Sequence, residues 1–113
     1  MIEGIGVDIV STERYIGVND VHLIRLASFI LSFDELNEYE IATNKVAFLA
    51  KHFAAKEAYL KAKGTGISKG TDLKTITIKH NKLGAPYLDV PEKTHLSISD
   101  ERNHVVAMVV IES

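Results

Sequence analysis

Hydrophobic and polar positions alternate at both ends of the chain and follow a helical spacing in between. Residues 4–10 alternate, with Ile5, Val7 and Ile9 on one side of the strand that this pattern predicts. Four further strands are expected at residues 75–79, 86–90, 95–99 and 105–111. The last of them is apolar on both faces, which is typical of a central strand.

The other side of the first strand carries Gly4, Gly6 and Asp8. Glycine weakens a strand, and Gly6 leaves room beside Asp8 for another backbone or a ligand. The alternative, which Asp8 alone would favour, is an edge strand with an exposed acid.

Three helices are expected between the first strand and the later ones. Asn19 or Asp20 can cap a helix over 21–31. Ser32 and Glu35 match a capping box at the start of a second, short helix. This box already provides Ser32 and Glu35 with a structural role.

The longest helix is expected from near Lys45 to Lys63, directly before Gly64. Glu57 and Lys61 interrupt its apolar side, one turn apart. Charges on a side that meets the core cost free energy unless each finds a partner. The two side chains can pair with each other, or they can belong to a ligand site.

The opposite side of this helix carries Phe48, His52, Ala55 and Tyr59. Two aromatic residues outside the main apolar side indicate that this side is covered as well. A second layer of the same chain or a neighbouring subunit can cover it, and the short chain favours a subunit.

Composition fits one globular domain over residues 1–113, with an α+β fold that joins an antiparallel sheet, one long helix and shorter helices after the first strand. The absence of cysteine excludes disulfides and thiolate chemistry. A net charge of −2 and a pI of about 6.2 argue against nonspecific nucleic-acid binding. No apolar run is long enough to span a bilayer, and the start lacks the basic residues of a signal peptide, so a cytoplasmic protein is expected.

Four segments carry a family resemblance: GIGVDIV at 4–10, FLAKHFAAKEAYLKAKGTGI at 48–67, GAPY at 84–87 and HLSIS at 95–99. In this order they resemble the small bacterial 4′-phosphopantetheinyl transferases, the holo-[acyl-carrier-protein] synthases. The resemblance extends over essentially the whole chain, and the long central match is its specific part.

The resemblance implies a reaction and an assembly. Such enzymes move the 4′-phosphopantetheine group of coenzyme A to a serine of acyl carrier protein in fatty acid biosynthesis. They release adenosine 3′,5′-bisphosphate and require Mg²⁺. The family is typically a homotrimer with active sites between subunits.

The resemblance also implies roles for individual residues. Asp8 and Glu57 match the metal-binding carboxylates, and Lys61 matches the catalytic lysine that reaches the coenzyme A phosphates. Two carboxylates with phosphate and water suit Mg²⁺. The segment of Gly64, Thr65 and Gly66 matches the part of the family that lies beside the coenzyme.

Three further residues are candidates for less specific roles. Glu35 is the candidate acceptor for the serine proton, directly or through a water. Arg14 and Arg25 are the candidate docking contacts for the acidic carrier protein. The helix after Arg14 carries few basic residues compared with the family, so slower or differently targeted docking is expected.

The chain departs from the family pattern at two other positions. Asp100 stands where the family often has histidine, and an acid there should repel the coenzyme phosphates, with His104 as the candidate to compensate. His52 stands where arginine is usual. One alternative is therefore an impaired family member that binds coenzyme A or a carrier without transfer. Another is a trimeric scaffold in which Glu57 and Lys61 pair with each other.

Overall fold

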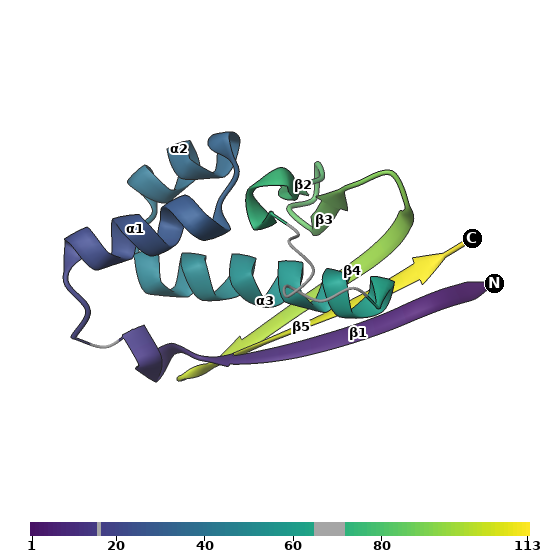
Figure 1. Ribbon diagram of the computed structural model, residues 1–113, viewed down its shortest axis with the longest axis horizontal. Helices are drawn as coiled ribbons and strands as arrows, with labels where there is room; N and C mark the ends of the chain where they lie inside the picture. Colours follow the sequence, from purple (N-terminus) through teal and green to yellow (C-terminus); the bar gives the residue numbers. More distant parts are fainter. Residues whose placement is uncertain (16, 65–71) are drawn as a thin grey trace.

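The computed structural model describes residues 1–15, 17–64 and 72–113, and its chain order is strand, helices, strands (Figure 1). The elements are β1 (Ile2–Ser11), η1 (Thr12–Tyr15), α1 (Asp20–Ile30), α2 (Phe33–Ile41), α3 (Lys45–Lys63), η3 (Leu73–Thr75), β2 (Thr77–His80), β3 (Pro86–Asp89), β4 (Lys93–Glu101) and β5 (His104–Glu112). The predicted α+β fold is confirmed. None of the helices described here has the length and apolar character needed to cross a membrane.

The strands form two sheets, whereas the sequence pattern predicted one. β5 lies between β1 and β4 in an antiparallel sheet, as expected for the most apolar strand. β2 and β3 form a separate two-stranded sheet. The prediction of one sheet was wrong because the chain bends at 90–92, after β3, and in the described residues β3 is hydrogen-bonded to β2 and not to β4. On the other edge of β2, the Ile78 N–H donates to Glu35 Oε2 at 2.7 Å.

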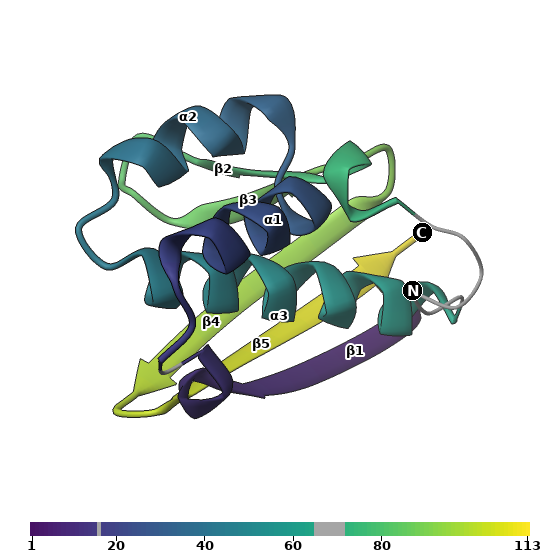
Figure 2. The same ribbon diagram turned by 60° about the vertical axis from the view of Figure 1, so that its left-hand side comes forward.

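The long helix α3 packs on one face of the three-stranded sheet, along β1 (Figure 2). Two glycines of β1 make this approach possible. A Cβ at Gly6 would lie 1.9 Å from the Ala58 carbonyl oxygen, and one at Gly4 would lie 2.0 Å from that of Ala62. The room beside Asp8 is therefore filled by the backbone of α3.

The other side of α3 is covered by the same chain. α1 and α2 pack against it, and the β2–β3 hairpin completes this second layer (Figure 2). Ala55 and Tyr59 are buried, and the Phe48 ring packs edge-on against Tyr39 with centroids 6.0 Å apart. The expectation that a neighbouring subunit covers this side was wrong, because the short helices after β1 fold back over it.

The uncovered apolar surface lies instead on the outer face of the three-stranded sheet. Ile5, Val7 and Ile9 of β1 are each more than half exposed. Met108 of β5 pairs with Val7 in register and is 44% exposed. Alternation along β1 thus directs one side of the strand to α3 and leaves an apolar side in solvent.

A candidate active site between the first strand and the long helix

Asp8 and Lys61 meet where β1 passes under the last turns of α3. Asp8 follows Gly4 and Gly6 on the helix-facing side of the strand, which brings its carboxylate to the helix. Lys61 Nζ donates to Asp8 Oδ1 at 3.0 Å and to the Val7 carbonyl oxygen at 3.0 Å. The structure therefore joins two predicted site residues that lie far apart along the chain.

Glu57 lies one turn before Lys61 on α3 and adds a second carboxylate. Its Oε1 is buried and has no hydrogen-bond partner among the described residues. Burial raises the pKa of Glu57, the nearby Asp8 carboxylate raises it further, and Lys61 opposes both. Lys61 pairs with Asp8, so the Glu57–Lys61 pair of the scaffold hypothesis is not the one that forms.

An unpartnered buried carboxylate oxygen beside a second carboxylate fits a bound cation. Hard cations such as Mg²⁺ take carboxylate oxygens as ligands and usually keep water or phosphate in the remaining positions. Within residues 1–15, 17–64 and 72–113, no group of three or more histidine, cysteine or acidic side chains has metal-binding geometry. Asp8 and Glu57 could therefore hold such an ion only together with ligands from solvent or a substrate.

Gly64 ends α3 as predicted, with φ of 80° in the left-handed region that glycine adopts readily. Its N–H donates to the carbonyl oxygens of Leu60 and Lys61. The remaining residues of this predicted coenzyme segment, Thr65 and Gly66, lie outside the described residues. The roles of all three beside the coenzyme stay predictions.

Glu35 belongs to a separate, buried network. The predicted capping box is present, with the Ser32 N–H donating to Glu35 Oε1 at 2.9 Å. The same oxygen accepts from Lys56 Nζ at 2.6 Å, and Oε2 accepts from the Ile78 N–H. In the described part of the chain, no hydrogen bond or ion pair connects Glu35 with the Asp8 site. Its role as a proton acceptor stays a prediction, which requires one of these bonds to open.

Lys56 is the functional candidate that the sequence analysis missed. It immediately precedes Glu57 and is 0% exposed. Burial lowers the pKa of Lys56, and the Glu35 carboxylate opposes this effect. The available signal was its spacing, since Lys56 lies four residues after His52 and three before Tyr59, on the second covered side of the helix.

His52, which replaces the usual arginine, is buried in this second layer. Its ring stacks on Phe48 with centroids 4.0 Å apart, and its Nδ1 lies 2.7 Å from the Phe48 carbonyl oxygen. Burial lowers the pKa of His52, against the opposing effect of Glu35. The folded protein therefore binds a proton at His52 less readily than the unfolded chain does.

We expect this shift to make the protein less stable as the pH falls below about 6.5, the ordinary pKa of histidine. In that range the unfolded state takes up a proton first, so the free energy of unfolding falls by at most about 1.4 kcal/mol per pH unit. Denaturant unfolding between pH 7.5 and 5 should show a weaker pH dependence for His52→Phe than for the wild type. Equal slopes for His52→Phe and the wild type would contradict the expectation.

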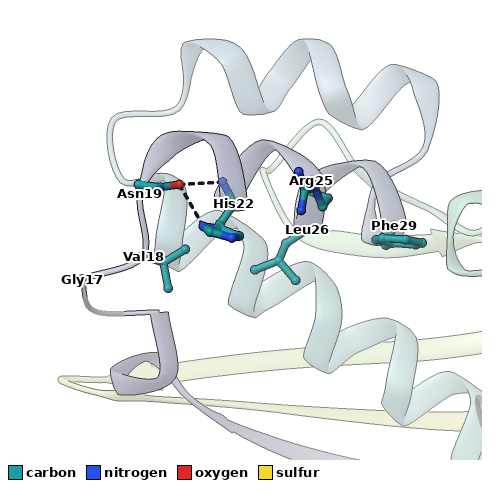
Figure 3. A pocket seen from close by; sticks show the side chains of 7 residues that line it. All are labelled: Gly17, Val18, Asn19, His22, Arg25, Leu26 and Phe29. Atoms are coloured by element: carbon teal, nitrogen blue, oxygen red, sulfur yellow. Dashed lines mark hydrogen bonds between the residues drawn. The ribbon is translucent and has the colours of Figure 1, made fainter.

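The predicted docking residues lie along one surface of α1 and η1. Arg25, His22 and Phe29 line a cavity of about 570 Å³. Figure 3 shows these side chains along α1. Arg14 lines a neighbouring cavity of about 480 Å³ that shares Leu26 and Phe29 with the first. Two cations thus flank an apolar surface, and Phe29 is 68% exposed within it.

Asp100, the other departure from the family pattern, forms an ion pair with a lysine of the same chain. Its carboxylate lies 3.8 Å from Lys51 Nζ at the exposed end of β4. A surface pair of this kind contributes little to stability, but it offsets the negative charge locally. The structure therefore lessens the repulsion that Asp100 alone would exert on an anionic ligand.

Comparison with known proteins links this geometry to a family. The chain matches the model of the 4′-phosphopantetheinyl transferase superfamily over residues 4–109. It is 41% identical to the holo-[acyl-carrier-protein] synthase of Dechloromonas aromatica, with 99% of this chain and 98% of that protein covered. The corresponding protein of Vibrio cholerae is 40% identical, with 99% and 98% covered.

Solved structures that resemble this fold come from the same family as these relatives. The holo-[acyl-carrier-protein] synthase of Neisseria meningitidis superimposes with a TM-score of 0.90 at 42% identity, over 100% of both chains. The structure of the Bacillus anthracis protein, described as a complex with CoA (3′,5′-ADP), has a TM-score of 0.87 at 38% identity. It covers 100% of this chain and 98% of that one.

Proposed function

Because the chain belongs to the 4′-phosphopantetheinyl transferase superfamily, we propose that it transfers the 4′-phosphopantetheine group of coenzyme A to a serine of an acyl carrier protein. The transfer releases adenosine 3′,5′-bisphosphate and serves fatty acid biosynthesis. The observation that carries the proposal is the cluster of Asp8, Glu57 and Lys61, with one buried carboxylate oxygen of Glu57 unpartnered.

Asp8 and Glu57 are proposed to hold a Mg²⁺ ion against the pyrophosphate of the coenzyme. When bound, Mg²⁺ neutralises charge on the phosphate oxygens and supplies electrostatic stabilisation to phosphoryl transfer. These residues suit Mg²⁺ because two carboxylates lie close together and the buried Oε1 of Glu57 has no hydrogen-bond partner among the described residues.

Lys61 is proposed to bind the phosphates of coenzyme A. Its ammonium is half exposed, and among the described residues Asp8 and one backbone carbonyl hold it, so it can turn to an incoming phosphate. A lysine ammonium acts there as a mobile point charge. The nucleophilic serine belongs to the carrier protein, so this chain needs no nucleophile of its own.

Arg14 and Arg25 are proposed to dock the acidic carrier protein beside the apolar surface of Phe29 and Leu26. Arg25→Ala should lower kcat/KM for the carrier about tenfold at low salt, and the difference should shrink as salt is added. Lys82→Ala, in the exposed turn after β2, should leave kcat/KM unchanged. Steady-state assays at two salt concentrations would contradict the docking role if Arg25→Ala matched the wild type in both.

A homotrimer with active sites between subunits is proposed from the outer face of the sheet. Ile5, Val7, Ile9 and Met108 form a contiguous apolar face that α3 does not cover. Such a face on a chain of this size favours burial against another copy.

Placing a charge on this face should disrupt the assembly. Met108→Lys should convert the trimer into smaller species and lower activity, as measured by light scattering after size-exclusion chromatography. Leu83→Lys, at a residue that is 94% exposed in the turn before β3, is the matched control and should leave the mass unchanged. A wild-type protein that is monomeric at micromolar concentration would contradict the proposal.

The proposed function is tested by the mass of an apo-carrier protein after incubation with this protein, coenzyme A and Mg²⁺. The carrier should gain one phosphopantetheine group, and EDTA should prevent the gain. Tight binding of coenzyme A without any gain of mass would favour the impaired alternative. Asp100 and the few basic residues of α1 are the observations that keep this alternative open.

A further inference from the structure

Lys56 and Glu35 form an ion pair with both side chains 0% exposed. The lysine donates to three acceptors, the Ile30 carbonyl at 2.6 Å, Glu35 Oε1 at 2.6 Å and the Leu73 carbonyl at 3.1 Å. An ammonium has three protons, so its hydrogen bonding is complete. Both carboxylate oxygens of Glu35 are likewise bonded, Oε1 to Lys56 and the Ser32 N–H and Oε2 to the Ile78 N–H.

These bonds join four segments to one point of α3. Ile30 is the last residue of α1, Glu35 lies in the first turn of α2, Leu73 begins η3, and the second oxygen of Glu35 binds β2. No other polar side chain in the described residues is as deeply buried as this pair. The helices and the hairpin of the second layer are thus connected to Lys56, directly or through Glu35.

Stability alone gives a weak reason for such a pair. Removing two charges from water costs free energy that their attraction often fails to exceed, and apolar residues of similar volume can replace buried pairs without loss. What the pair supplies is a fixed geometry, because every bond other than the one between the two side chains joins them to a defined backbone group.

The position of Lys56 on α3 connects this buried pair to the Asp8–Glu57–Lys61 site. Lys56 and Glu57 are consecutive and therefore point about 100° apart, one to the helical layer and the other towards β1. On the sheet side, α3 is fixed by its contact with Gly4 and Gly6. On the other side, the bond to Ile30 ties α3 to the end of α1, one residue after the exposed Phe29.

We infer that Lys56 and Glu35 are a positioning pair for phosphopantetheine transfer: they hold the carrier-docking surface of α1 in register with the Asp8–Glu57–Lys61 site. This inference rests on the proposed function. Neither residue contacts substrate in this inference, so it replaces the predicted role of Glu35 as proton acceptor, since both of its oxygens are already bonded within the fold. Breaking the pair displaces the carrier serine relative to the phosphate under attack, and a displacement of about 1 Å is enough to slow such a step about 100-fold.

The test is a steady-state comparison of wild type with the double variant Glu35→Gln/Lys56→Met, in which both charges are removed and the amide oxygen can still accept from one of the two backbone N–H groups. Measured at a temperature where circular dichroism shows both proteins folded, kcat/KM for the carrier should fall about 10- to 100-fold. KM for coenzyme A should stay within about twofold, because the Asp8 site itself is unchanged.

Two further variants separate positioning from stability. Leu88→Ala removes a buried side chain from the same layer without touching the pair, so it should lower Tm and leave kcat/KM near the wild-type value. Glu35→Asp keeps both charges but shortens the reach, and it should lower kcat even if the double variant does not fold. Unchanged kcat/KM in Glu35→Asp or in a folded double variant would overturn the inference, whereas an inactive wild type would overturn the proposed function instead.

Discussion

Replacing Asp8 with Asn, or Glu57 with Gln, should lower phosphopantetheine transfer at least about 100-fold in a protein that remains folded. Each change removes one charged oxygen ligand from the proposed Mg²⁺ site, where the ion supplies several kcal/mol of charge stabilisation. The measurement is the initial rate at which an apo-carrier gains mass at saturating coenzyme A. Glu101→Gln, at the exposed end of β4, is the matched control and should keep full activity.

The stability of the Glu57→Gln variant shows whether Glu57 serves as a metal ligand or stabilises the fold. Because the folded state raises the pKa of Glu57, it holds that proton to a higher pH than the unfolded chain, so ionisation of Glu57 lowers stability as the pH rises above about 4.5. The neutral Gln avoids this loss, so without metal and coenzyme its Tm at pH 7 should equal or exceed that of the wild type. A lower Tm together with retained transfer would show that Glu57 serves the fold.

Gly6→Ala should destabilise the protein by about 3 kcal/mol or more, at the upper end of overpacking effects. The added Cβ would lie 1.9 Å from the Ala58 carbonyl oxygen, and neither can rotate away, because the Cβ is bonded directly to the backbone and the carbonyl is part of it. We expect Tm to fall by about 10 °C or more. Transfer should fall as well, because separating β1 from α3 moves Asp8 away from Glu57.

Gly84→Ala provides the comparison for this substitution. Gly84 has φ of 87° and open space around its Cβ position, so alanine there adds backbone strain without a clash. Its cost should be about 1–2 kcal/mol, with transfer retained. Equal Tm values for the two variants would mean that α3 does not approach β1 as closely as described.

The sequence predicted the parts of the molecule that depend on local pattern. The caps at Asn19 and Ser32 and the glycine stop at Gly64 were readable because each rests on contacts between near neighbours. The pairing of Asp8 with the α3 site followed from the family pattern, since the two segments lie far apart along the chain.

Long-range contacts account for what the sequence did not reveal. The Ile78 N–H on the outer edge of β2 bonds to Glu35, 43 residues earlier in the chain. Lys56 is buried because three groups distant in sequence bind it. The sequence pattern predicted that the apolar surface left for a subunit lies on α3, whereas it lies on β1. The prediction failed because periodicity shows that a side of a helix is apolar without showing what covers it. In the same way, the alternation of Ile5, Val7 and Ile9 showed that one side of β1 is apolar without showing whether anything covers it.

Anomalous scattering from Mn²⁺, used in place of Mg²⁺ in crystals grown with coenzyme A, tests the central claim most directly. The account predicts a peak within about 2.2 Å of one carboxylate oxygen of Asp8 and one of Glu57, because both acids bind the same ion. A peak that contacts only one of them, or that lies elsewhere on the protein, would contradict it.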